Sequence, residues 1–412
     1  MVQDTQQLFR EREQRVIDAV QLKVPDRVPV SISFSYFPAR FAGVTTRDAF
    51  YDLKKWGPAC IKTALYFQPD RCGLTTNQSG WVLETLDHKQ LLWPGHGVSD
   101  QHCHQFVEGE YMKADEYDLF LQDMSDFLLR YYLPRVYGVL EPLSQLRPFN
   151  SNLGGLPLAT LATPEWAALF EKLSKAARYA VEWQSGVNAL IEELHGLGFP
   201  VRSGATTGGG SPFDGISDFL RGMCGTMLDM YRQPDKLIAA VEKLAQIQVQ
   251  RIKTGPKAKG FTLVFVALHR GADGFMSKKQ FETFYWPFLK ENLIALVEAG
   301  YTPNVFFEGD YTSRLEYLLE LPKGKVLGLF DCSDMTRVKE VLGGHMCIAG
   351  NVPSSLLQTG STQEVRDYCK WLIDVVGKDG GYIMAPRSSI DEVKPENLKA
   401  MIDFTKEYGK YR

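Results

Sequence analysis

Four polar side chains follow apolar runs of the sequence at positions where they could do chemistry. These runs end, in chain order, in His269, Glu308, Asp331 and Asn351. An imidazole and two carboxylates can bind a divalent metal and leave a coordination position open for substrate. The same groups can also donate and accept protons without a metal. Because these residues are far apart in the sequence and form no local metal motif, both kinds of site stay open.

The apolar runs themselves predict the elements that position these side chains. They are short, rich in β-branched residues and separated by stretches of helical periodicity. The eight predicted strands are Val28–Phe34, Arg71–Thr75, Pro200–Ala205, Phe261–His269, Pro303–Glu308, Val326–Asp331, Met346–Asn351 and Tyr382–Pro386. No GxGxxG turn follows the first strand, so the pattern favours an α/β protein with a single closed (β/α)8 TIM-type barrel over a doubly wound sheet. Such barrels carry their sites at the carboxyl ends of the strands, where the four residues stand.

Two helices are predicted in detail. One begins after a leading proline and spans Pro234–Thr254. The other starts at Ser277 as N-cap and ends at Gly300. Pro287 lies inside this second helix and is expected to bend or interrupt it.

The N-terminal half is longer than a barrel alone needs. No linker or repeat divides the chain, so residues 1–412 are predicted to form one domain. Residues 76–199 are too many for a single crossover, and we expect a cap-like elaboration with several helices and a hairpin at 80–110. Aromatic residues of the N-terminal part, including Tyr36, Phe37 and either Trp81 or Trp93, are expected to roof the cavity.

Two further motifs have alternative explanations. The run Thr206 to Pro212, which reads TTGGGSP, could cradle a phosphate, but it lacks the lysine of a P-loop and favours a tight turn. His102 and His104 face the same way on an extended segment and could bind a metal with His96. An exposed position or a role in lining the cap is the preferred interpretation, since no further ligand is near them in the sequence.

Composition excludes some function classes. The 412 residues include 46 Lys and Arg against 49 Asp and Glu, and this balance predicts no binding to nucleic acid or to an anionic membrane. No apolar run is long enough to span a membrane, and the polar start does not resemble a signal peptide. Seven cysteines without a CxxC pair are typical of reduced thiols, so a cytoplasmic location is expected.

Several stretches together resemble the uroporphyrinogen decarboxylase superfamily. They are Asp26-Arg27-Val28-Pro29-Val30, GGGSPFDGISDFLRG from Gly208, GADGFMSKKQFETFYWP from Gly271, Ile348-Ala349-Gly350-Asn351-Val352-Pro353 with the following Leu356, Leu357 and Gly360, and Gly380-Gly381-Tyr382-Ile383-Met384 running to Pro395-Glu396-Asn397-Leu398. The resemblance covers most of the chain and implies a (β/α)8 barrel. The superfamily includes decarboxylases and corrinoid-dependent methyltransferases, some of which methylate coenzyme M.

The sequence departs from both branches at informative positions. Where the decarboxylase has an arginine-rich signature, only Arg40 and its neighbourhood are similar, and a tetrapyrrole with many carboxylates needs several cationic partners. The coenzyme M methyltransferases place zinc on a His-x-Cys pair and a later Cys. The matching stretches here are Phe306-Phe307-Glu308 and Pro386-Arg387-Ser388-Ser389, so zinc activation of a thiol is not supported.

The resemblance and the strand-end residues together predict a methyltransferase. It would move a methyl group between a small organic substrate, of methyl ether or methylamine type, and a separate corrinoid protein, since no corrinoid-binding DxHxxG motif occurs. Glu308 and Asp331 would donate a proton or hold a metal such as zinc, with His269 as a further ligand or orienting group. Tyr36, Phe37, Arg40, Arg270 and Asn351 are the predicted substrate-binding residues.

Two alternatives and the oligomeric state complete the predictions. The chain could be a decarboxylase or lyase of a small carboxylic acid, with Arg40 and Arg270 binding the carboxylate. It could also be a non-catalytic ligand-binding barrel. A homodimer is expected.

Overall fold

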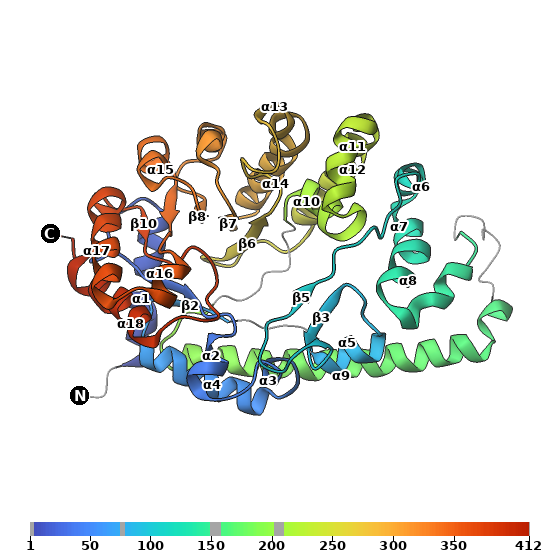
Figure 1. Cartoon of the computed structure of the whole chain (residues 1–412), viewed down its shortest axis with the longest axis horizontal. Coiled ribbons are helices and arrows are strands. Elements are labelled where there is room, and N and C mark those ends of the chain that lie inside the picture. The colour runs from blue at the N-terminus through green and yellow to red at the C-terminus, as the bar shows by residue number, and fades with distance from the viewer. Residues whose placement is uncertain (1–3, 75–78, 149–157, 202–209, 412) are drawn as a thin grey trace.

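A parallel five-stranded sheet lies at the centre of the computed structural model, which describes residues 4–74, 79–148, 158–201 and 210–411 (Figure 1). The strands follow the order β10-β9-β8-β7-β6. Their bounds are β6 (Leu263–Leu268), β7 (Thr302–Phe307), β8 (Leu327–Phe330), β9 (Cys347–Ala349) and β10 (Tyr382–Ile383). Parallel strands joined by helices confirm the predicted α/β class.

Two more strands continue this sheet beyond β10. Val30 forms a parallel β-bridge with Met384, which directly follows β10. Val30 in turn directly precedes β1 (Ser31–Ser33), and β1 pairs in parallel with β2 (Arg71–Gly73). On the other side of β2, Cys72 bridges Val201 in parallel. Seven of the eight predicted runs therefore contain a strand. Six of these strands are shorter than the predicted run, whereas β7 has the predicted length and begins and ends one residue earlier. The remaining predicted strand is Pro200–Ala205, and its residues 202–205 lie outside the described part of the chain. Most of the predicted TTGGGSP turn also lies outside it.

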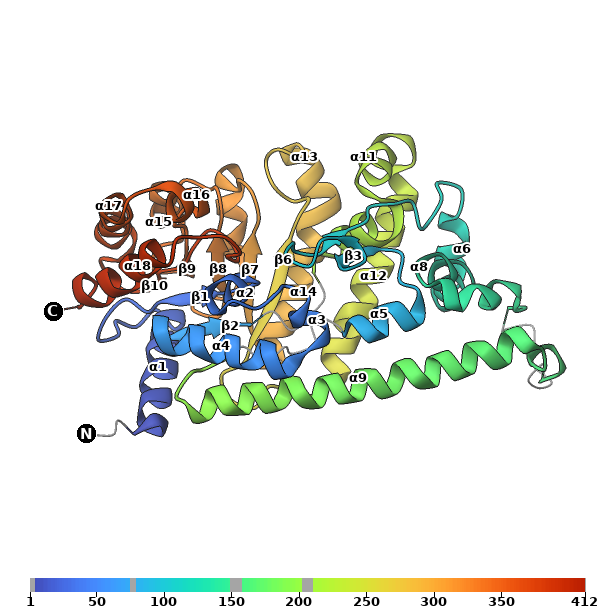
Figure 2. The same ribbon diagram turned by 60° about the horizontal axis from the view of Figure 1, so that its bottom comes forward.

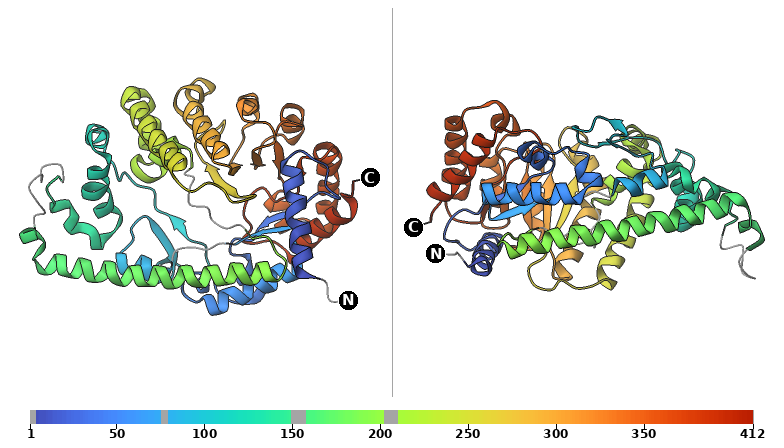
Figure 3. Two further views of the ribbon diagram at one scale, coloured as in Figure 1. Left: turned by 180° about the vertical axis from the view of Figure 1, so that it is seen from behind. Right: turned by 90° about the horizontal axis from the view of Figure 1, so that it is seen from below.

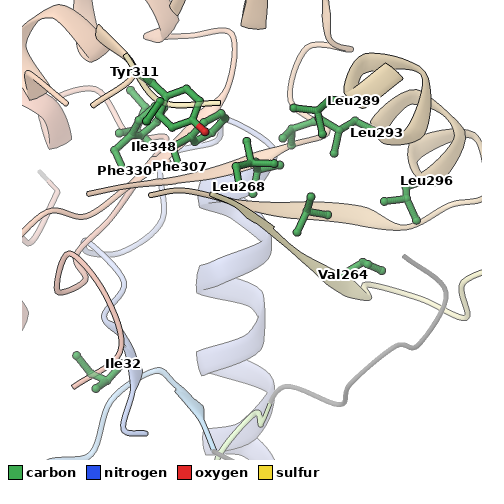
Figure 4. Close-up of a cluster of buried hydrophobic side chains, with 14 of the residues drawn as sticks. Ile32, Val264, Leu268, Leu289, Leu293, Leu296, Phe307, Tyr311, Phe330 and Ile348 are labelled. Carbon is green, nitrogen blue, oxygen red and sulfur yellow. The ribbon is translucent and has the colours of Figure 1, made fainter. Parts of the chain in front are cut away.

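Side chains alternate between the two faces of each strand, so they pack into two different hydrophobic cores. The outer residues Val264 and Leu268 pack with Leu289, Leu293 and Leu296 of the helix α14, as Figure 4 shows. α14 spans Trp286–Glu298. The residues on the opposite face, called the inner face below, include Leu263, Leu327 and Ile383, and they pack with Val16, Ala19 and Val20 of α1 (Thr5–Val20). Figure 3 shows α1 standing beside the strands, so this helix covers one end of the inner face.

The predicted helices are confirmed. α12 has the predicted bounds Pro234–Thr254. Ser277 caps α13 (Lys278–Gln280) in a reciprocal capping box with Gln280. A π-helical turn, η6 (Phe281–Tyr285), then separates α13 from α14. Pro287 is the cause we assign, because proline has no N–H to donate and its ring clashes with the carbonyl four residues earlier.

The chain between β2 and Val201 contains short elements and one long helix. The predicted hairpin is present, since β3 (Leu91–Pro94) pairs antiparallel with β5 (Gln105–Phe106), while β4 (Gly97–Val98) lies on the other side of β3. α9 (Pro164–Gly196) packs on α5 (Gly80–Leu86) and α4 (Leu53–Phe67). It runs along one side of the whole molecule in Figures 1 and 2 and returns the chain to the sheet.

The other helical elements lie in two places: some surround the sheet, and others, among them α6, α7 and α8, lie away from it in the N-terminal elaboration (Figure 1). No helix in the described ranges is both long enough and apolar enough to cross a membrane. The bounds of these other helical elements are α2 (Phe37–Ala42), α3 (Asp48–Tyr51), α6 (Tyr117–Gln122), α7 (Met124–Phe127), η1 (Leu128–Tyr132), α8 (Leu133–Val136), η2 (Gly138–Gln145), η4 (Leu158–Leu161), α10 (Pro212–Ile216), η5 (Ser217–Arg221), α11 (Met223–Arg232), η7 (Thr312–Glu320), α15 (Met335–Leu342), α16 (Ser354–Thr359), α17 (Thr362–Leu372), η8 (Ile373–Gly377) and α18 (Pro395–Tyr408).

Candidate functional site

The strand-end residues His269, Glu308 and Asp331 meet at one pocket. Side chains alternate between the faces of a strand, so residues two apart share a face. Phe306 lies on the inner face of β7 and Leu329 on that of β8, and Glu308 and Asp331 follow them two positions later. The pocket has a volume of about 690 Å³ and is lined by Phe106, Glu108, Asp218, Phe219, His269, Arg270, Phe275, Glu308, Gly309 and Asp331. We call it the strand-end pocket.

His269 lies between two carboxylates of this pocket. Its Nδ1 is 2.5 Å from Oδ2 of Asp218, and its Nε2 is 3.6 Å from Oε2 of Glu308. The hydrogen bond to Asp218 raises the pKa of His269, and the negative charges of Asp218, Asp214 and Glu308 raise it further, against the opposing effect of partial burial. The imidazolium form of His269 therefore persists to higher pH than that of an ordinary histidine. The Glu308 side chain is 52% exposed, so this carboxylate is open to a ligand.

Asp214 holds the backbone that carries His269. Its Oδ2 accepts hydrogen bonds from the amide of His269 at 2.9 Å and from the hydroxyl of Tyr285 at 2.6 Å. Its Oδ1 accepts from the amide of Arg270 at 3.0 Å. Burial raises the pKa of Asp214 to about 6 even with these donors around it. A buried carboxyl group therefore fixes the turn that follows β6.

Arg270 lines the strand-end pocket, as predicted, but it has partners of its own. Its Nη2 is 3.2 Å from Oδ1 of Asp218, and its Nε donates to Oγ of Ser217 at 3.1 Å. The guanidinium also lies over the ring of Phe275, with its carbon 5.3 Å from the ring centre. Asp218 thus connects Arg270 and His269, and the charge of Arg270 is largely balanced within the protein.

Asp331 does not complete a metal site with His269 and Glu308. Its Oδ2 accepts from the backbone amide of Gly309 at 3.0 Å, which ties the end of β8 to the end of β7. Among the residues that the structure describes, no three His, Cys, Asp or Glu side chains are grouped so that they could hold a metal ion. The predicted three-residue zinc site therefore does not fit the positions of these side chains.

Asn351 lies under the pocket rather than in its wall. It is 2% exposed. Its Nδ2 donates to the carbonyl of Asp331 at 2.9 Å, and its Oδ1 accepts from the hydroxyl of Tyr368 at 3.0 Å. Both ends of the side chain are used within the protein, so Asn351 positions Asp331 and offers no free group to a substrate.

Tyr36, Phe37 and Arg40 belong to α2 and its N-cap, and none of them lines the strand-end pocket. The hydroxyl of Tyr36 is 2.5 Å from Nδ1 of His104. Phe37 is 2% exposed and stacks in the hydrophobic core. Arg40 forms an ion pair of 2.5 Å with Glu392. The structure therefore separates these three predicted substrate contacts from His269 and Glu308.

The predicted aromatic roof and histidine cluster have other partners. Trp93 is buried, and its Nε1 donates to the hydroxyl of Tyr51 at 2.8 Å, whereas Trp81 is 45% exposed. His96 hydrogen-bonds Glu84 at 2.7 Å, and His102 hydrogen-bonds Ser99. Neither tryptophan lines the strand-end pocket, and His96, His102 and His104 each hydrogen-bond a different residue.

Sequence reasoning missed Asp214, Asp218 and the three phenylalanines of the strand-end pocket. A signal for the aspartates was present, because Asp214 and Asp218 are four residues apart in SPFDGISDFLRG and so share a helix face. Phe106, Phe219 and Phe275 come from three segments that only the tertiary fold brings together. No local pattern marks them.

Comparisons with known proteins agree on one family and one fold. The family model "Uroporphyrinogen decarboxylase (URO-D)" matches residues 198–408. The uroporphyrinogen decarboxylase of Syntrophotalea carbinolica is 23% identical over 174 residues, which are 42% of this chain and 49% of that protein. The enzyme of Chloroherpeton thalassium is 24% identical over 192 residues, 44% of this chain and 52% of that protein. The chain thus spans about half the length of the curated relatives it matches.

A solved structure is similar over nearly the whole chain. It is a methyltransferase from Methanosarcina mazei, with a TM-score of 0.60 and 14% sequence identity. The match covers 96% of this chain and 98% of that one. At this identity the match shows a shared fold, which includes the N-terminal elaboration as well as the sheet.

Proposed function

Because this chain belongs to the uroporphyrinogen decarboxylase family, we propose that it is a methyltransferase of that family's fold. It moves a methyl group between a small methyl ether or methylamine and a corrinoid carried by a separate protein. Residues 1–412 act as one domain, built on a closed (β/α)8 barrel. The observation that carries the proposal is His269, held by Asp218 with its Nε2 facing Glu308 in the strand-end pocket.

Methyl transfer from oxygen or nitrogen needs a proton at the leaving atom. An alkoxide or an amide anion leaves poorly, and a positioned acid lowers that barrier. His269 suits this role because its pKa is raised, so its protonated form persists to higher pH. Asp218 fixes Nδ1, which leaves the Nε2 proton directed at the pocket. In the reverse direction the same nitrogen takes the proton back.

The charges of the pocket select among methyl donors. Among the residues that the structure describes, Arg270 contributes the only guanidinium to its wall, and carboxylates come from Glu108, Asp218, Glu308 and Asp331. Such a pocket repels an acid with many carboxylates and attracts ammonium groups or hydroxyl donors. Glu308, which is half exposed, is the group that would bind them. This balance supports a neutral or cationic methyl compound over a tetrapyrrole.

The partner would dock at the rim of the strand-end pocket. Three exposed phenylalanines stand there, Phe106, Phe219 and Phe275, with exposed fractions of 45%, 47% and 42%. Phe106 meets Phe219 edge to face at 5.6 Å between ring centres. Exposed aromatic groups beside a pocket are typical of binding surfaces. The corrinoid supplies the cobalt that accepts or donates the methyl group, and no step of this proposal uses a protein-bound metal.

Decarboxylation of a small acid is the second candidate, because the curated relatives are decarboxylases. Arg270 would then bind the carboxylate and His269 would protonate the carbanion. The ion pair between Arg270 and Asp218 weakens this alternative, because the Arg270 guanidinium would have to bind the Asp218 carboxylate and the substrate carboxylate at the same time.

One assay separates the two reactions. The purified protein is mixed with a reduced corrinoid protein and a panel of methyl ethers, methylamines and small carboxylic acids, while methyl-cobalt absorbance and CO2 release are recorded together. We expect methyl-cobalt from at least one methyl donor, a loss of about 100-fold or more in His269→Gln, and no loss in the exposed control His102→Gln. CO2 release that depends on His269, without methyl-cobalt, would contradict the proposal.

A further inference from the structure

A second cavity lies inside the sheet, on its inner face. Its volume is about 280 Å³, and residues of β1, β2 and β6 to β10 contribute to its wall. It does not share a lining residue with the strand-end pocket. We call it the inner cavity.

Arg71 brings a positive charge into the inner cavity. This residue begins β2 and shares the inner face with Gly73, whereas Cys72 between them points into the outer core. Its side chain forms no hydrogen bond or ion pair with any residue in the described ranges. Glu13 acts on it only through space, and burial lowers the pKa of Arg71 to about 10, so it stays charged at neutral pH.

The Arg71 side chain is half-buried. A charge that is largely removed from water is normally paired within the protein. The contrast with Arg12 is direct, since that nearby guanidinium donates to the carbonyl of Gly198 and to the side chain of Gln68. Arg71 thus lacks the internal partners that Arg12 has, and a bound anion would supply one.

Hydrogen-bonding groups surround Arg71 in the inner cavity. Ser31 is its ladder partner on β1, and Ser33 and Asn304 face the same space. The hydroxyls of Ser388 and Ser389 border it from the segment after β10, and Ser389 donates to Ser33 at 3.0 Å. None of the described residues that line the inner cavity carries a carboxylate. An anion there would meet one guanidinium and several donors.

The remaining wall is apolar and flat. The rings of Phe265 and Phe306 lie nearly parallel, 6.3 Å apart between centres and tilted by 17°. Leu327, Leu329 and Ile383 line the cavity beside them. A purely inorganic anion would leave this apolar surface without a partner, whereas a ring or short hydrocarbon chain would cover it.

We propose that the inner cavity binds a small carboxylate with an apolar body. The carboxylate pairs with the guanidinium of Arg71, whose planar fork matches two carboxylate oxygens, and the body packs against Phe265 and Phe306. The strand-end pocket, which is rich in carboxylates, repels the same ligand. This site does not rest on the proposed methyl transfer, because it is defined by binding alone.

Calorimetric titration with benzoate tests the inner cavity. We expect saturable binding to the wild-type protein with one molecule per chain, weakened at least about 10-fold in Arg71→Met. Benzamide keeps the ring of benzoate but carries no charge. We expect its affinity for the wild-type protein to be no higher than the affinity of benzoate for Arg71→Met. Arg40→Met is the matched control, since Arg40 is exposed and paired with Glu392 outside the cavity, and its affinity for benzoate is expected to equal that of the wild type.

Two further arms keep the test decisive. Phe306→Ala removes the apolar wall without touching the charge, and it is expected to weaken benzoate while leaving sulfate unchanged. If Arg71→Met does not fold by circular dichroism, Arg71→Lys carries the test, with an intermediate loss of affinity because its ammonium cannot form the bidentate pair. Benzoate affinity unchanged in a folded Arg71 variant, or sulfate binding as tight as benzoate, would overturn the proposal. An inactive enzyme that still binds benzoate through Arg71 would leave the inner cavity supported and the methyl transfer refuted.

Discussion

Replacing Asp214 by asparagine should remove a specific pH dependence of stability. Asp214 is buried, 3% exposed, and its pKa is raised from 3.8 to about 6 because burial disfavours the charged form. The folded protein therefore holds this proton more tightly than the unfolded chain. Stability from this group is fully present below pH 3.8 and is lost as pH rises through about 6.

The size of the effect follows from the shift in the pKa of Asp214. A change from 3.8 to about 6 corresponds to about 3 kcal/mol in total, at 1.36 kcal/mol per unit. Between pH 5 and pH 8, about 1.4 kcal/mol of it remains to be lost. Asparagine does not titrate, so the difference in unfolding free energy between wild type and Asp214→Asn should change by that amount, in favour of the variant at pH 8.

Urea denaturation of both proteins at half-unit steps from pH 5 to pH 8 measures this difference. Titrating groups that do not interact with Asp214 are present in both proteins and cancel to first order. His269 does not cancel, because the charge of Asp214 raises its pKa, so the titration of His269 is followed by NMR in both proteins and its contribution is subtracted. Asp70→Asn is the matched control, since Asp70 is another fully buried aspartate, bound by Arg15 and Arg27 at the opposite end of the strands. A constant difference for Asp214→Asn across the whole range would refute the reasoning that burial raises this pKa.

Three further predictions follow from the same structure. Asp218→Asn should lower the pKa of His269, seen by NMR titration, because it removes the largest cause of the upward shift, and an unchanged titration would contradict this. Glu308→Gln should reduce turnover by about 100-fold or more while the melting curve stays unchanged; wild-type turnover would remove Glu308 from the site. Leu293→Ala should destabilise the protein by about 2–5 kcal/mol in urea, because Leu293 is fully buried against the sheet, and a smaller loss would show that this site can collapse.

One property of buried strands allowed the sequence to predict both the secondary-structure elements and the meeting of three polar residues at one site. A period of two along buried strands fixes which side chains share a face, so His269, Glu308 and Asp331 had to reach the same end of the sheet. The pairing order and strand direction could be predicted too, because strands alternating with helices favour parallel neighbours. Most strands are shorter than predicted, since ladder hydrogen bonds end before the apolar runs do. Closure of the predicted barrel stays a prediction, because most of the third predicted strand lies outside the described residues.

What the sequence could not predict is which polar residues the protein uses internally. Asn351 has the same place after its strand as Asp331 has after β8, yet it is buried and holds the carbonyl of Asp331. Tyr36 and Phe37 are aromatic in either role, and only the packing of α2 shows that Phe37 is core. Arg71 lay inside a predicted strand, where nothing in the pattern distinguishes a paired cation from an unpaired one.

The pH dependence of the first methyl-transfer turnover tests the central claim most directly. In the proposed reaction His269 is the acid that protonates the leaving atom, and its pKa is raised. The rate of methyl-cobalt formation should therefore be constant at low pH and fall as pH rises through the pKa of His269. In His269→Gln the rate should be lower throughout and lose this fall, whereas His102→Gln should keep it. A rate that rises with pH, or a fall that persists unchanged in His269→Gln, would contradict the assignment of His269 as the proton donor.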